Sequence, residues 1–147
     1  MKKSVWPIIG ADVLLAAFVM TALFGLSTTP AAAQDVIPIQ VSPSAIILSS
    51  AHSGPVTVHA DISYSAVASG TVLLYCDRDP NPIKPYITFP DDRGQLVAKF
   101  RLGDVIGILG TISGRVNVTF TLTGDTNAGG SFTGSDDAMV RQNPAPK

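Results

Sequence analysis

Three aspartates in predicted turns are the best candidates for ligand chemistry in this sequence. Asp91 and Asp92 open the turn Asp91-Asp92-Arg93-Gly94, and Asp125 opens a second turn that runs to Gly130. Carboxylate oxygens supplied by loops are ligands that Ca²⁺ prefers. The competing interpretation is that Asp and Gly simply build turns, because an Asp side chain bonds to nearby backbone groups. A calcium site at Asp91, Asp92 and Asp125 is therefore a hypothesis that requires the two turns to converge.

Other patterns that could indicate metal binding or catalysis are incomplete. His52 and His59 are two histidines without a third partner, which does not make a zinc or copper site. The run Asp77–Asn81 begins like an EF-hand loop, but Pro82 and Thr88 stand where that loop needs Gly and Glu. The sequence contains no G-x-S-x-G motif and no phosphate-binding loop with its lysine. We therefore expect no enzyme activity and no cofactor.

Cys76 is the only cysteine, so no disulfide can form within the chain. Leu74 and Cys76 lie on one side of a strand predicted over 71–76, which favours a buried thiol that acts as a small apolar side chain. The other side carries Leu73 and Tyr75, so both sides of this strand are apolar. Either the strand is covered on both faces, or Leu73 and Tyr75 form a docking patch for a partner.

Residues 1–33 have the three-part layout of a secretory signal peptide. Two lysines follow the initiator methionine, an uncharged apolar run covers 13–26, and the small residues Ala31 and Ala33 precede Gln34. Cleavage after Ala33 would leave a mature chain of 114 residues that begins at Gln34. We expect an exported protein, periplasmic or secreted.

A retained membrane anchor is the alternative. The 14 residues of the apolar run span about 21 Å as a helix, whereas a bilayer core is about 30 Å thick. Extending the segment to residues 5–26 reaches the necessary length but includes Asp12, which is costly in a bilayer. The protein would touch the membrane only through this segment, and only if it stays uncleaved.

Composition limits the class of the mature part. It has no Glu and is rich in Thr, Val, Ser and Gly, which favours strands and turns over helices. Eight Lys and Arg side chains against ten Asp give a net charge near −2, and the basic residues are scattered singly. Because there is no basic stripe, we expect no nucleic-acid partner. There is also no polybasic run for anionic lipid.

Alternation of apolar and polar residues predicts the elements. The clearest strands are Pro55–Tyr64 and Arg115–Gly124. Five further strands are predicted over 45–49, 71–76, 86–89, 95–101 and 131–141, the last with a bulge near Gly134. Helical spacing predicts one or two turns of helix over 102–109. Residues 34–43 form a lead-in that contains two prolines and is at most an edge strand, and residues 142–147 form a disordered tail.

Seven short strands separated by turns predict an antiparallel sandwich over 44–141. This pattern resembles the immunoglobulin-like and fibronectin type III-like β-sandwich domains of exported bacterial proteins. It departs from true immunoglobulin domains because it has no cysteine pair and its only tryptophan, Trp6, lies in the export segment. The resemblance implies an all-β, seven-stranded fold after a signal-peptide helix. It also implies that the loops 65–70, 90–94 and 124–130 gather at one end.

Fold alone says little about activity, because this architecture hosts many functions. The expected function is a non-enzymatic module with a structural or protein-interaction role in the bacterial cell envelope. Its partner would be an unidentified envelope or extracellular protein. The alternative is a calcium- or carbohydrate-binding module that uses the loop end near Asp91, Asp92 and Asp125.

Overall fold

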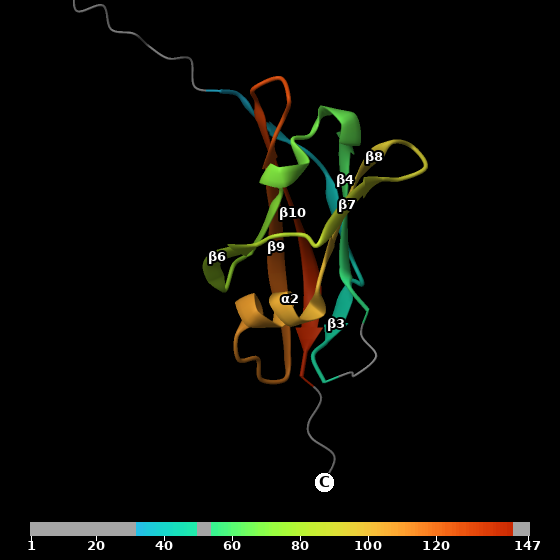
Figure 1. The fold of residues 1–147 in the computed structure, drawn as a ribbon. Helices are drawn as coiled ribbons and strands as arrows, with labels where there is room; N and C mark the ends of the chain where they lie inside the picture. The colour runs from blue at the N-terminus through green and yellow to red at the C-terminus, as the bar shows by residue number, and fades with distance from the viewer. Residues whose placement is uncertain (1–31, 50–53, 143–147) are drawn as a thin grey trace, which may run out of the picture. The chain divides into compact units, whose positions relative to one another are not determined.

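Two β-sheets lie against one hydrophobic core in the computed structural model, which describes residues 32–49 and 54–142 (Figure 1). The predicted signal segment up to Ala31, His52 and the tail after 142 fall outside the described residues. Within the described part, no helix has both the length and the apolar character needed to cross a membrane.

Sheet A has the strand order β1-β10-β9-β5-β6, and β3 also pairs with β10. Its strands are β1 (Gln34–Val36), β3 (Ala45–Ile47), β5 (Leu73–Cys76), β6 (Asp79–Ile83), β9 (Arg115–Asp125) and β10 (Ser131–Arg141). The long hairpin of β9 and β10 is its centre. On the side away from β9, β10 pairs in parallel with β1 near its start and with β3 near its end.

Sheet B has the strand order β2-β4-β8-β7, and every pair in it is antiparallel. Its strands are β2 (Ile39–Ser42), β4 (Val56–Ser63), β7 (Ile87–Pro90) and β8 (Gln95–Phe100). Two short 3₁₀ turns, η1 (Tyr64–Ala66) and η2 (Ser69–Thr71), connect β4 to β5. The chain therefore alternates between the sheets as it passes from β1 to β5.

The all-β class predicted from composition is confirmed, but the expected number of seven strands is wrong. The described residues contain ten strands. The three additional ones are β1 and β2, in the segment expected to be a lead-in, and β6, in a segment for which no strand is predicted. Proline explains why β6 was missed: Pro80 and Pro82 cannot donate to a ladder, but β6 is the outer strand of sheet A, where an edge tolerates them.

The core is made of the apolar faces of both sheets. Val118, Phe120 and Leu122 alternate along β9 and are completely buried, and so is Val58 on β4. Among the described residues, no buried side chain is polar or charged. Ile62, which alternation also predicts to be buried, is only half-buried, because the β4–β8 register shifts between Ala60 and Ser63.

The predicted helix is present as α2 (Leu102–Leu109), at the end of the sandwich opposite the β9–β10 turn (Figure 1). Its last carbonyls, which have no partner within the helix, are bound by the β5–β6 region. The Cys76 thiol donates to the Ile108 carbonyl at 3.2 Å, and Arg78 Nε donates to the Leu109 carbonyl at 2.9 Å. These contacts attach α2 to sheet A.

The bulge predicted near Gly134 is wrong. The β9–β10 pairing runs without interruption from Asp125 opposite Ser131 to Arg115 opposite Arg141. Gly134 is required for a different reason: a Cβ at this position would lie 2.5 Å from the Ile37 carbonyl oxygen. The chain crosses over Gly134 as it passes from β1 to β2, and only a residue without a side chain leaves room for it.

Candidate functional site

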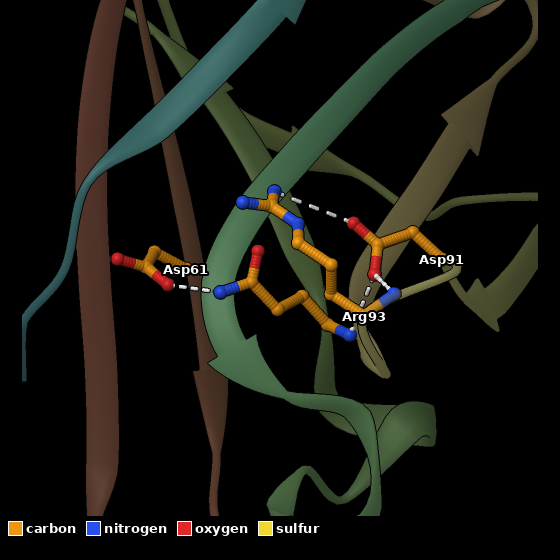
Figure 2. A network of polar contacts seen from close by, with 4 residues as sticks. Asp61, Asp91 and Arg93 are labelled. Carbon is orange, nitrogen blue, oxygen red and sulfur yellow. Dashed lines mark hydrogen bonds and ion pairs between the residues drawn. The ribbon is translucent and has the colours of Figure 1, made fainter.

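The turn between β7 and β8 holds a polar network centred on Asp91 (Figure 2). One carboxylate oxygen of Asp91 accepts the backbone N–H groups of Arg93 at 2.8 Å and Gln95 at 2.9 Å. The other oxygen lies 3.5 Å from Nη2 of Arg93. The bond from the Gln95 backbone, aided by Arg93, lowers the pKa of the Asp91 carboxyl below its ordinary value. This carboxylate is therefore occupied by its own turn.

Gln95 extends the network to the neighbouring strand. Its side-chain amide donates to the carboxylate of Asp61 on β4 (Figure 2). These side chains help to line a shallow groove on the outer side of sheet B, which sequence analysis did not identify. The groove is lined by Pro38, Ile39, Gln40, His59, Ala60, Asp61, Arg93 and Gln95. The alternation along β4 did place His59 and Asp61 on one face, but the loop residue Arg93 reaches this groove only through the turn geometry.

The loops expected to gather at one end do so. The segment 64–71 lies between the other two loops: the Tyr64 N–H donates to the Gly94 carbonyl, and the Ala68 N–H donates to the Asp125 carbonyl, both at 2.9 Å. Asn127 completes the contact by donating from its side chain to the Ser65 carbonyl at 3.0 Å. The sandwich prediction therefore placed these loops correctly.

The three candidate calcium ligands nevertheless do not form a metal-binding group. Asp92 and Asp125 are exposed, whereas Asp91 turns inward to its own loop. Across residues 32–49 and 54–142, no three His, Cys, Asp or Glu side chains lie close enough together to hold a metal ion. The loops thus come together, but the carboxylates of Asp91, Asp92 and Asp125 do not.

Leu73 and Tyr75 lie on the side of β5 that faces away from the core, and both are half-buried. Leu73 pairs with Thr123 and Tyr75 pairs with Thr121 on the adjoining strand β9. We call the outward-facing residues of β1, β5, β9 and β10 the outer face of sheet A. Leu73 and Tyr75, for which a docking patch is one of the two predicted alternatives, are therefore the β5 part of this outer face.

Cys76 faces the opposite side of the same strand. Its exposed fraction is 7%, which confirms the predicted buried thiol. Its bond to the α2 carbonyl gives it a structural role in attaching the helix.

Comparison with known proteins gives no relative from which a function could be transferred. No family model matches the chain, and no match was found among the curated proteins or among the solved structures. The functional argument therefore depends on the molecule's own surface.

Proposed function

We propose that this chain is an exported, non-enzymatic β-sandwich module with a structural or protein-interaction role in the bacterial cell envelope. The observation that carries the proposal is the composition of the outer face of sheet A. Between its ends it presents Leu73, Tyr75 and a set of hydroxyl side chains, and Asp137 is the one charged side chain in the central rows of β9 and β10. Depletion of charge beside aromatic residues is the compositional feature of interface centres.

The strand order supports an immunoglobulin-like variant of the sandwich. In that architecture one sheet has the order A-B-E-D, and the other contains G, F and C, extended in the variable type by C′. Chain order assigns β2, β4, β8 and β7 to the first sheet and β10, β9, β5 and β6 to the second. This correspondence depends on sheet topology alone and adds nothing about activity.

The position of the first described strand supports export with cleavage. β1 begins at Gln34, directly after the predicted cleavage site at Ala33. Removal of residues 1–33 would therefore leave all ten described strands intact. Mass spectrometry of the exported protein should find Gln34 at its N-terminus, whereas an uncleaved chain in the membrane fraction would favour the anchor.

Site-specific photo-crosslinking in the producing cells tests the interaction role. A photo-crosslinkable phenylalanine analogue at Tyr75 should give one discrete protein adduct. The matched control is the same analogue at Lys99, which lies on the outer side of sheet B. A discrete adduct from Lys99 but none from Tyr75 would contradict the proposal. A rise in melting temperature in millimolar Ca²⁺ would instead favour the calcium-binding alternative, because a ligand of the folded state stabilises it.

A further inference from the structure

The outer face of sheet A is ordered as rows, because β9 and β10 pair without a shift over eleven residues each. Outward-facing residues alternate along both strands, so each row contains one residue from β9 and one from β10. The first row is Arg115 with Arg141, and the last row is Asp125 with Ser131. At about 3.3 Å per residue, these two rows lie roughly 33 Å apart.

The two ends of this face carry opposite charge. Arg115 and Arg141 are direct cross-strand neighbours, an arrangement of like charges that is unfavourable within one molecule. Arg115 and Asp125 are both exposed. In the described part of the chain, the one salt bridge is between Arg93 and Asp91. Arg115, Arg141 and Asp125 therefore have no ion-pair partner within this part of the molecule.

Hydroxyl groups at the centre of the face are already hydrogen-bonded within the molecule. Thr121 and Ser135 bond to each other at 2.8 Å, and the Thr119 hydroxyl donates to Asp137 at 2.7 Å. Asp137 is the one carboxylate in the central rows of β9 and β10. At the outer margin of the face, Val36 on β1 is 83% exposed, the highest value among the large apolar side chains described.

We propose that this face binds a second copy of the same chain, sheet against sheet, across a two-fold axis that lies between the two faces, parallel to them and perpendicular to the strands. The inference deepens the proposed function, on which it rests for the choice of surface, and it names the partner. A two-fold interface joins one surface to itself and must therefore be self-complementary. An antiparallel arrangement places the arginine row of each copy over Asp125 of the other, whereas a parallel arrangement would place arginine over arginine.

The axis passes between the third and fourth rows, at the level of Phe120 and Asp136. Asp137 of one copy then lies opposite the row of Thr121 and Ser135 in the other, whose hydroxyl groups can donate to it. Tyr75 lies in line with that same row. Face-to-face sheets pack about 10 Å apart, a spacing that the half-buried Thr and Tyr side chains can fill.

Charge reversal tests the arrangement, with the exported protein as recovered from producing cells. Sedimentation equilibrium should give twice the chain mass at roughly 100 µM, and added NaCl should weaken the dimer because it screens the end contacts. Arg115→Asp and Asp125→Arg should each raise the dimer dissociation constant by at least about tenfold. The double variant should recover a large part of the lost affinity, because the exchanged charges again face each other.

Lys99→Asp is the matched control, because it makes the same charge change on the other sheet, and it should leave the dimer unchanged. Circular dichroism checks that each variant is folded; Arg115→Gln replaces Arg115→Asp if the latter is unfolded. A monomeric wild-type protein at roughly 100 µM, or failure of the double variant to recover affinity, overturns the proposal. A monomer that still gives a discrete Tyr75 adduct of another protein overturns the dimer and leaves the proposed function standing.

Discussion

Asp91 fixes the β7–β8 turn through a charged side chain, and this makes a prediction about pH. Its pKa is lowered in the folded protein, chiefly by the Gln95 backbone N–H, so the ionised form favours folding. That contribution is complete above the unfolded pKa of about 4 and is lost as pH falls through the lower folded value. In thermal melts, Asp91→Asn should be less stable than the wild type at pH 7, and the difference should shrink below about pH 4.

The matched variant for this experiment is Asp92→Asn, which removes the same charge from an exposed neighbour. Its melting temperature should follow the wild type at all pH values. Parallel pH profiles for Asp91→Asn and the wild type would show that the turn does not depend on the ionised carboxylate.

Cys76 gives a second prediction at the scale of one side chain. Because the thiol is buried and donates to the Ile108 carbonyl, Ellman's reagent should label it slowly in the folded protein and rapidly after unfolding. Cys76→Ala should cost about 1 kcal/mol of unfolding free energy, in the low range for core truncations. Rapid labelling of the folded protein, or a disulfide-linked dimer on a non-reducing gel, would mean that the thiol is accessible.

At the scale of the elements, the segment that connects β1 to β2 passes so close to Gly134 that no side chain fits at that position. Gly134→Ala should destabilise the protein, because its Cβ would meet the Ile37 carbonyl oxygen and the Ile39 side chain, both at 2.5 Å. The control is Gly107→Ala in α2, where a Cβ meets no atom within 4 Å. Alanine is favoured over glycine inside a helix, so the control should gain up to about 1 kcal/mol. Chemical denaturation of both variants measures the contrast, and equal midpoints would refute it.

Strands with a clear alternation were predictable from sequence, and strands that depend on their neighbours were not. β4 and β9 lie within a residue or so of their expected bounds, because period-two alternation is a local signal. β6 was missed because its prolines are acceptable only at an edge, and edge position is decided by the whole sheet. Gly134 likewise could not be interpreted correctly without knowing which segment passes over it.

At the scale of the whole molecule, the core depends on large side chains shared by both sheets. Phe120 is completely buried, so Phe120→Ala should lower the free energy of unfolding by about 3–5 kcal/mol in urea denaturation. Thr57→Ala, on the outer side of sheet B, is the comparison and should change it by no more than about 0.5 kcal/mol. Similar midpoints for the two variants would mean that Phe120 contributes little to packing.

The candidate site shows the same limit on prediction at this scale. A sandwich requires the loops 65–70, 90–94 and 124–130 to share one end, and this was predictable from strand order. Which way each carboxylate points was not, because Asp91 is directed by two backbone N–H groups of its own turn. The row structure of sheet A was equally hidden, since it requires the register between β9 and β10.

The parallel pairing of β10 with β1 and β3 has a mechanical consequence. Gln34 lies beside Ser131 at the start of β10, whereas Ile47 lies beside Arg141 at its end. A pull applied at residues 34 and 142 would slide β1 and β3 along β10 and load their ladders in shear. A pull at residues 115 and 141 would instead unzip β9 from β10 one pair at a time. Single-molecule stretching should therefore give the larger unfolding force for the first geometry, since forced unfolding follows the unfolding barrier.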